Sequence, residues 1–274
     1  MRLAAGRARD LGLPTRGTTA PGRLKRVDRW LLHCLGQPRT GFVRTAEPLV
    51  VDLGYGSSTI TTVELACALR RLRAEVRVVG VENDRARVGS ALLETVPAGV
   101  TFVYGGFDVA SLRPFAIRAM NVLRQYEESA VPAAWAQLRT ALSPGGIVVE
   151  GTCDELGRRG SWVTLDAAGP TTLTLSAHLA TLERPSDIAP RLPKALIHRN
   201  VPGEPVHAFL TAADDAWTRA APQATFGPRQ RWADMCARLR AAGWPVLDGP
   251  RRWRLGELSV PWSAVAPAEG RVSE

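Results

Sequence analysis

The stretch VVDLGYGSS, residues 50–58, decides the fold. Its apolar start is typical of a buried strand, and two glycines, Gly54 and Gly56, follow before small polar residues. Glycine allows a tight turn and lets backbone N–H groups come close to a ligand. In open α/β sheets, ligands bind beyond the carboxyl ends of strands, where such turns lie. The stretch therefore predicts a strand, a tight turn and a helix, with a binding site at the turn.

The surrounding sequence alternates short apolar runs with segments of helical periodicity, from about residue 46 to residue 152. This alternation is the signature of βα units around a parallel sheet. We therefore predict an α/β fold with a Rossmann-like, doubly wound and mostly parallel sheet. The expected strands are residues 49–53, 76–81, 100–104, 117–123 and 147–149, and the expected helices are 60–72, 84–95 and 132–142.

The rhythm changes after residue 152, where turn residues separate short alternating runs and longer helical patterns follow. These patterns predict antiparallel strands at the end of the sheet and a helical C-terminal extension. An amphipathic helix is also expected before the first strand, because apolar residues recur there at helical spacing. The expected strands are residues 161–165 and 171–175, and the expected helices are 23–35, 204–220 and 228–242.

The positive charge of the chain is concentrated in its N-terminal part. Residues 1–44 hold ten basic and two acidic residues, a net +8, which leaves only +1 of the total +9 for residues 45–274. We predict a basic N-terminal arm or helix at 1–44, a binding domain at 45–180, and an extension at 181–274 packed on that domain. Arginine makes up 33 of the 35 basic residues, which points to the coding bias of a GC-rich genome.

Composition excludes several classes of protein. The chain has no uncharged apolar run near the ~18–20 residues that a membrane span needs, and its basic N-terminus lacks the apolar segment of a secretory signal. The four cysteines are far apart and form no Cys/His cluster, so neither a disulfide framework nor a zinc site is expected. We predict a cytoplasmic protein that binds neither a metal nor a membrane.

The residues around the glycine turn distinguish between two classes of cofactor. The dinucleotide fingerprint G-x-G-x-x-G requires a third glycine, and Thr59 stands in its place. An acid, Asp52, precedes Gly54 by two residues. A carboxylate there suits a ligand with a positively charged amino-acid end, whereas it would repel a pyrophosphate.

The order Asp-x-Gly-x-Gly resembles motif I of the class I S-adenosylmethionine-dependent methyltransferases. The resemblance implies that Asp52 helps to hold the methionine part of the cofactor. It also implies that Gly54, Tyr55 and Gly56 form the turn beneath it. The third glycine of the family would fall at Ser58, a departure that many members tolerate.

A second acid supports the resemblance. Glu82 ends the second predicted strand within VVGVEND, residues 78–84. A carboxylate at a strand end can accept two hydrogen bonds from a ribose diol. Glu82 matches the position that has this role in the family, and Asn83 lies beside it. Asp84 is expected to cap the next helix instead.

The adenine contacts depart from the family pattern. The family often places an Asp after the third strand to bind the adenine amino group, and the corresponding residue in GGFD, residues 105–108, is Gly106. Adenine would then be held by the Phe107 ring, by backbone amides, or by Asp108 reaching back. Asn121 matches the fourth motif, which in the family faces the methyl group and the acceptor.

Other stretches narrow the subclass. LSPGG, residues 142–146, matches a feature that the family often carries before its fifth strand. Enzymes that methylate amino groups of bases often carry Pro-Pro after the Asn, and this chain does not. Enzymes that methylate carbon 5 of cytosine need a Cys that follows Pro, and none of the four cysteines does. Two nucleic-acid subclasses thus lose support.

The sequence therefore predicts an enzyme that transfers a methyl group from S-adenosylmethionine by in-line displacement. A small-molecule acceptor is favoured because residues 45–274 are nearly neutral. An RNA methyltransferase that uses the basic arm, and an inactive cofactor-binding protein, remain alternatives. His198, Glu150 and Asp154 are candidates for a base, and the residues alone do not assign one.

Overall fold

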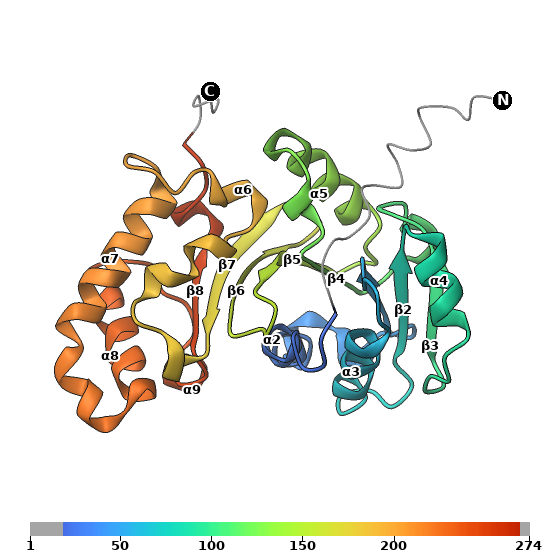
Figure 1. The fold of residues 1–274 in the computed structure, drawn as a ribbon, viewed down its shortest axis with the longest axis horizontal. Coiled ribbons are helices and arrows are strands. Elements are labelled where there is room, and N and C mark those ends of the chain that lie inside the picture. The colour runs from blue at the N-terminus through green and yellow to red at the C-terminus, as the bar shows by residue number, and fades with distance from the viewer. Residues whose placement is uncertain (1–18, 269–274) are drawn as a thin grey trace. The chain divides into compact units, whose positions relative to one another are not determined.

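The computed structural model describes residues 19–268, which form two compact units. Unit 1 contains the described residues up to Glu150, together with 155–157 and 165–169. Unit 2 contains residues 151–154, 158–164 and the described residues from Pro170 onward. This division falls at residue 150, whereas the sequence predicted a domain boundary at 180. Figure 1 shows the elements of both units along the chain.

Unit 1 is built around parallel strands in the order β3-β2-β1-β4-β5. β1 pairs in parallel with both β2 and β4, and β2 pairs in parallel with β3. This order is that of a doubly wound sheet, which places a ligand at the carboxyl end of β1. The predicted fold is confirmed. The strands are β1 (Leu49–Leu53), β2 (Arg77–Glu82), β3 (Val100–Tyr104), β4 (Ala116–Met120) and β5 (Ile147–Cys153).

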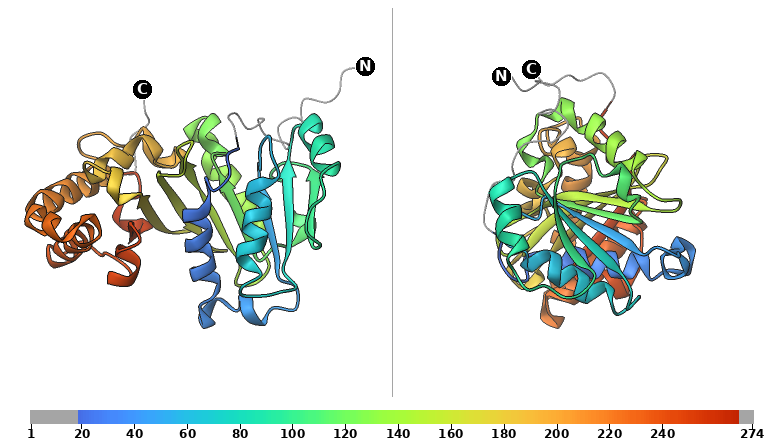
Figure 2. Two further views of the ribbon diagram at one scale, coloured as in Figure 1. Left: turned by 60° about the horizontal axis from the view of Figure 1, so that its bottom comes forward. Right: turned by 90° about the vertical axis from the view of Figure 1, so that its right-hand side faces the viewer.

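Helices flank these strands, with α2 and α3 on one face and α5 on the other (Figure 2). The Asp84 side chain accepts hydrogen bonds from the backbone N–H groups of Ala86 and Arg87, at 2.9 and 3.2 Å, and so begins α4 as predicted. The helices are α2 (Lys25–Leu35), α3 (Ile60–Leu69), α4 (Arg85–Leu92) and α5 (Val131–Thr140).

Unit 2 combines antiparallel strands with helices. β7 pairs antiparallel with β8, with Leu175 opposite Leu258. Trp162 and Trp232 are fully buried there, and the Trp232 indole donates to the carbonyl of Glu257 at 3.2 Å. The strands are β6 (Arg159–Leu165), β7 (Pro170–Ala177) and β8 (Glu257–Pro261). The helices are α6 (Lys194–Ile197), α7 (Pro205–Arg219), α8 (Pro228–Ala241) and α9 (Pro250–Trp253).

Three strands differ clearly from the prediction. β5 extends to Cys153, whereas the sequence predicted a strand at 147–149. β4 ends at Met120 rather than at residue 123, because Asn121 has a φ of 63° and a 3-10 turn follows it. β8 was not predicted, although ELSVP alternates apolar and polar residues as a half-buried strand does. Over residues 19–268, no helix is both long enough and apolar enough to cross a membrane.

Candidate functional site

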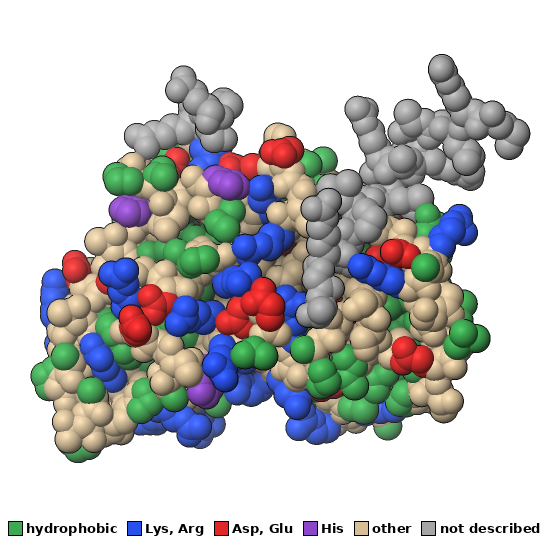
Figure 3. All heavy atoms as spheres, in the orientation of Figure 1, with side chains coloured by type: hydrophobic (Ala, Val, Ile, Leu, Met, Phe, Trp, Pro, Cys, Tyr) green, Lys and Arg blue, Asp and Glu red, His purple; other side chains and the backbone are tan. Residues whose placement is uncertain are grey.

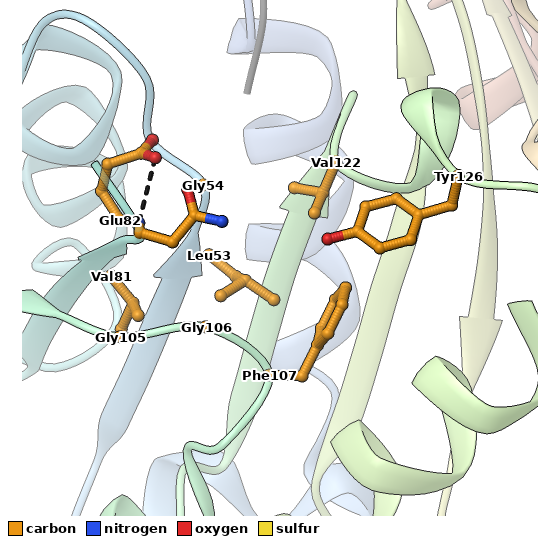
Figure 4. Close-up of a pocket in the computed structure, with 10 residues that line it drawn as sticks. Leu53, Gly54, Val81, Glu82, Gly105, Gly106, Phe107, Val122 and Tyr126 are labelled. Atoms are coloured by element: carbon orange, nitrogen blue, oxygen red, sulfur yellow. Dashed lines mark hydrogen bonds between the residues drawn. The ribbon is translucent and has the colours of Figure 1, made fainter. Parts of the chain in front are cut away.

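A pocket lies at the carboxyl ends of β1 and β2 and reaches the loops that follow β3 and β4 (Figure 4). The empty space in it, open mouth included, is about 240 Å³. The pocket therefore lies at the turn that the sequence singled out. Its lining residues are Leu53, Gly54, Val81, Glu82, Asn83, Gly105, Gly106, Phe107, Val122 and Tyr126.

The glycine turn is fastened to the acid at the end of β2. Both Gly54 and Gly56 have positive φ, 68° and 84°, which favours glycine at these positions. The Gly56 N–H donates to Oε2 of Glu82 at 2.9 Å, and the Asn83 N–H donates to Oε1 at 3.0 Å. Arg87 lies 3.6 Å from the same carboxylate, which is buried. Each carboxylate oxygen can accept more than one hydrogen bond, so Glu82 retains capacity for a ligand hydroxyl.

Two aromatic rings form another wall of the pocket. The rings of Phe107 and Tyr126 meet edge to face, with centroids 5.6 Å apart. Figure 4 shows Tyr126 with its hydroxyl end turned toward Val122 and the middle of the pocket. Gly105 and Gly106 carry no side chains, so the backbone before Phe107 is open to a ligand. This wall suits a flat aromatic group such as a nucleobase.

Asp52 does not line the pocket but belongs to a buried ion cluster. Arg118 donates to its two oxygens through Nε and Nη2, at 2.9 and 2.6 Å, and the Thr62 hydroxyl donates at 2.7 Å. Arg118 also binds Asp28 of α2 and donates to the carbonyl of Thr61 at 3.0 Å. The cluster ties α2 and α3 to the strand that leads into the glycine turn.

Burial and charge act against each other in this cluster. Burial raises the pKa of the Asp28 carboxyl to about 6, although Arg118 lowers it. Burial by itself lowers the pKa of Arg118, but Asp28 and Asp52 outweigh it, so the net shift is upward. Arg118 therefore stays charged, and the cluster depends on it to neutralise the two carboxyl groups.

Tyr55 and Asn121 also lie outside the pocket lining. The Tyr55 ring packs edge to face on Phe102 at 4.9 Å between centroids, and its buried hydroxyl has no hydrogen-bond partner among the described residues. Burial, and then the nearby Glu82 carboxylate, raise the pKa of this hydroxyl. Asn121 lies directly before the lining residue Val122.

The structure thus brings together about half of the predicted site. Gly54, Glu82, Asn83, Gly106 and Phe107 line the pocket, whereas Asp52, Tyr55, Gly56 and Asn121 do not. The prediction missed the apolar residues at the strand ends and the ring of Tyr126. Tyr126 follows the fourth strand, and this position could have indicated that it lines the site. The missed lining residues are Leu53, Val81, Gly105, Val122 and Tyr126.

The three candidate bases also lie outside the lining. The Glu150 carboxyl is buried and accepts from the Trp135 indole at 3.2 Å. Asp154 accepts from two backbone N–H groups of its own turn, at 2.8 and 3.0 Å. His198 in unit 2 lies 3.0 Å from Nζ of Lys194 and is exposed. Over residues 19–268, no group of His, Cys, Asp or Glu is arranged to hold a metal ion.

Glu150 leads to a prediction on stability and pH. Burial raises the pKa of Glu150 to about 8, against the smaller opposing effect of Trp135. The carboxyl is therefore neutral in the fold, and the stability that this provides is complete below the unfolded pKa and lost as the pH rises through 8. We expect urea unfolding to show a few kcal/mol of destabilisation between pH 5 and 8.5 that Glu150→Gln lacks. Parallel pH profiles for wild type and Glu150→Gln would contradict this.

Comparison with known proteins finds likeness in structure only. No protein-family model and no curated protein matches the chain. Among solved structures, a DUF574 family protein from Streptomyces avermitilis matches at 20% identity and TM-score 0.36, over 47% of this chain and 53% of that one. The CcbJ methyltransferase from Streptomyces caelestis matches at 18% identity and TM-score 0.34, over 60% and 70%.

A third similar structure is human N-acetylserotonin methyltransferase in complex with SAM, at 18% identity and TM-score 0.32, over 50% of this chain and 40% of that one. The chain spans about half the length of the first structures that it matches. With TM-scores below 0.5, these likenesses assign neither an activity nor a substrate to this chain.

Proposed function

We propose that the pocket binds S-adenosylmethionine and that the chain is a methyltransferase. The observation that carries the proposal is the hydrogen bond from the Gly56 N–H to Glu82. In a dinucleotide site the N–H groups of the glycine turn face a pyrophosphate. Here a carboxylate occupies that donor and would repel a phosphate. The site instead suits a ligand with a ribose diol and no phosphate.

Each wall of the pocket then has a role toward this ligand. Glu82 would accept hydrogen bonds from the ribose hydroxyls, and the rings of Phe107 and Tyr126 would flank the adenine. Gly54 leaves room for the methionine part beside the turn. Because Arg118 and Thr62 occupy both oxygens of Asp52, we assign Asp52 to positioning the end of β1 rather than to direct contact with the ligand.

S-adenosylmethionine held by Glu82, Phe107 and Tyr126 would supply an electrophilic methyl carbon to the acceptor atom, with S-adenosylhomocysteine as the other product. The chain contributes by holding the nucleoside so that the methyl group faces the acceptor, which provides up to ~7–11 kcal/mol in the best-oriented reactions. An acceptor that carries a proton passes it to a base or to water.

We propose two acceptors: a small molecule, which we favour, and RNA as the alternative. They are called the small-molecule form and the RNA form of the proposal. The small-molecule form is supported by the lack of the Pro-Pro and Pro-Cys motifs. The near neutrality of residues 45–274 supports a small-molecule acceptor only weakly, because residues 219–254 carry a net +6 and residues 45–218 a net −3. Release of labelled S-adenosylhomocysteine in the presence of cell extract separates both forms from an inactive binding protein.

Calorimetric titration tests the choice of cofactor. We expect S-adenosylhomocysteine to bind with a dissociation constant in the micromolar range or below and NAD to bind at least ~100-fold more weakly, because the phosphates of NAD would face Glu82. ATP serves as a second phosphate-bearing control. Tighter binding of NAD than of S-adenosylhomocysteine would reverse the assignment.

The aromatic wall leads to a further prediction. Phe107→Leu should weaken the binding of S-adenosylhomocysteine about 2–10-fold, because an aromatic contact is worth about 0.5–1.5 kcal/mol. Tyr104→Leu is the matched control, since the Tyr104 ring stacks under Arg85 at 4.1 Å and does not line the pocket. Equal effects of the two substitutions would show that the ring of Phe107 has no contact with the ligand.

A further inference from the structure

The near-neutral charge of residues 45–274 conceals one strongly basic segment. Residues 219–254 hold eight arginines and two acids, a net +6, whereas residues 45–218 hold 16 basic and 19 acidic residues, a net −3. A genome rich in G and C replaces Lys by Arg, but it does not gather positive charge in one stretch. Coding bias therefore does not explain the excess of positive charge in residues 219–254, and such a charge attracts anionic partners.

The fold of unit 2 presents this charge on its surface. The segment forms the end of α7, the 3-10 turn Ala221–Phe226, α8 and α9. The apolar residues of α8 face inward, whereas Arg229, Arg238 and Arg240 are exposed. The buried residues of α8 are Trp232, Ala233, Met235, Cys236 and Leu239. Figure 3 shows basic side chains at the lower edge of unit 2, close to where Figure 1 places α9.

Four of these arginines are free to bind an external anion. Arg219, Arg229, Arg251 and Arg254 are exposed, and none of them forms an ion pair with a residue that the structure describes. The other four have partners inside the unit. Arg231 and Arg240 stack on Trp217 and Trp253, Arg238 pairs with Asp234, and Arg252 pairs with Glu257.

The free arginines come from three neighbouring helices. Arg219 ends α7, Arg229 lies in the first turn of α8 on the other side of the 3-10 turn, and Arg251 and Arg254 lie in and after α9, which contacts α8. Arg240 near the far end of α8 donates to the carbonyls of Val246 and Asp248 in the loop before α9, and it stacks on Trp253 of α9. The 14 residues of α8 span about 21 Å, the length of roughly six stacked nucleotides at ~3.4 Å each.

We propose that this surface, formed by residues 219–254 and called the α8 basic surface, binds the phosphodiester backbone of a nucleic acid. The planar guanidinium of arginine matches a phosphate with two parallel hydrogen bonds. Phe226 at one end is 75% exposed and offers a ring on which a base can stack. The inference goes beyond the proposed cofactor site and does not depend on it.

An anionic membrane fits the surface less well. Helices that lie in a membrane interface expose a continuous apolar face beside their basic one. The apolar side chains of α8 are buried in unit 2, and Phe226 is the one large apolar side chain of this surface that is strongly exposed among the described residues. A nucleic acid needs only the charges and an occasional ring.

Fluorescence anisotropy with the full chain tests the inference. The probes are a labelled 20-nucleotide single-stranded RNA and the DNA of the same sequence, titrated between 50 and 300 mM salt. We expect binding that weakens steeply with salt, and binding of either probe supports the proposal. In the triple variant Arg229→Gln, Arg251→Gln, Arg254→Gln, the dissociation constant should rise at least 10-fold at 50 mM salt. The slope of log K against log salt should fall by about 2.

The control variant removes the same charge elsewhere. Arg71, Arg77 and Arg113 are exposed in unit 1, and their triple change to Gln should alter binding less than 3-fold. Equal losses in both variants, no binding by wild type, or binding only to phosphatidylserine vesicles would overturn the proposal. S-adenosylhomocysteine titrated into each variant shows separately whether the cofactor site exists, so the two proposals can fail independently.

Discussion

Arg118→Met is expected to lower the free energy of unfolding by about 3–5 kcal/mol, the cost of breaking a buried ion pair. The substitution leaves Asp28 and Asp52 in contact with a hydrophobic side chain, with no cation to offset their burial. Arg118 is fully buried, and it bonds to both acids and to a backbone carbonyl. Urea unfolding followed by circular dichroism at pH 7 measures the change.

The pH dependence separates this account from a general packing defect. Without Arg118, no cation offsets the burial that raises the pKa of the Asp28 carboxyl, so this carboxyl is stable in the fold only when protonated. The deficit of the variant should therefore shrink as the pH falls from 7 to 5. Arg77→Met is the matched control, because Arg77 is exposed and lies 3.9 Å from an exposed Glu47. It should change stability by no more than about 1 kcal/mol. A deficit that does not change with pH would contradict the role given to Arg118.

Glu82→Gln is expected to weaken the binding of S-adenosylhomocysteine about 10–100-fold. The amide removes the negative charge that would accept hydrogen bonds from the ribose, and bonds to charged groups are worth about 1.5–3 kcal/mol. The substitution also perturbs the bond from Gly56. Glu94→Gln removes the same charge from an exposed residue outside the pocket and should leave binding within 2-fold.

A double-mutant cycle that varies both Glu82 and the ribose hydroxyl isolates the ribose contact. 5′-Methylthioadenosine and its 2′-deoxy form are each titrated by calorimetry into wild type and into Glu82→Gln. Wild type should prefer the 2′-hydroxyl form, and Glu82→Gln should lose most of that preference, because the hydroxyl then has no charged partner. An unchanged preference in the variant would mean that Glu82 does not contact the ribose and that the turn alone explains the loss.

The fold was predictable because β1, β2 and β4 are short, mostly apolar runs and a helical pattern follows each of them in the chain. Gly54 and Glu82 were also predictable, since both end a strand and strand ends meet at one edge of a parallel sheet. The role of Asp52 was harder to predict from the sequence. Its partner Arg118 is 66 residues away in the chain and becomes its neighbour only through the pairing of β1 with β4.

The sequence did hold a signal for this cluster. Arg118 interrupts the apolar run AIRAM of β4, and Asp28 lies among the apolar residues of α2. A charge inside a buried element must find a partner of opposite sign. Two such interruptions of opposite sign, beside the acid of the glycine turn, favour a buried cluster over a ligand contact.

Averaging over long segments concealed two other features. In the net charge of residues 45–274, the +6 of residues 219–254 is largely cancelled by the acidic residues elsewhere in this range. The strand β8 follows an Arg- and Trp-rich stretch, and its alternation of polar and apolar residues covers only five positions. Both features lie in unit 2, in stretches that match no sequence motif, so a prediction there depends on composition and periodicity alone.

A crystal structure of the chain with S-adenosylhomocysteine shows whether this pocket is the cofactor site. We expect the ribose hydroxyls to lie within hydrogen-bond distance of the Glu82 carboxylate, the adenine to lie against Phe107 and Tyr126, and Arg118 still to hold Asp52. A nucleoside bound elsewhere, or an Asp52 carboxylate released from Arg118 to hold the ligand, would contradict it.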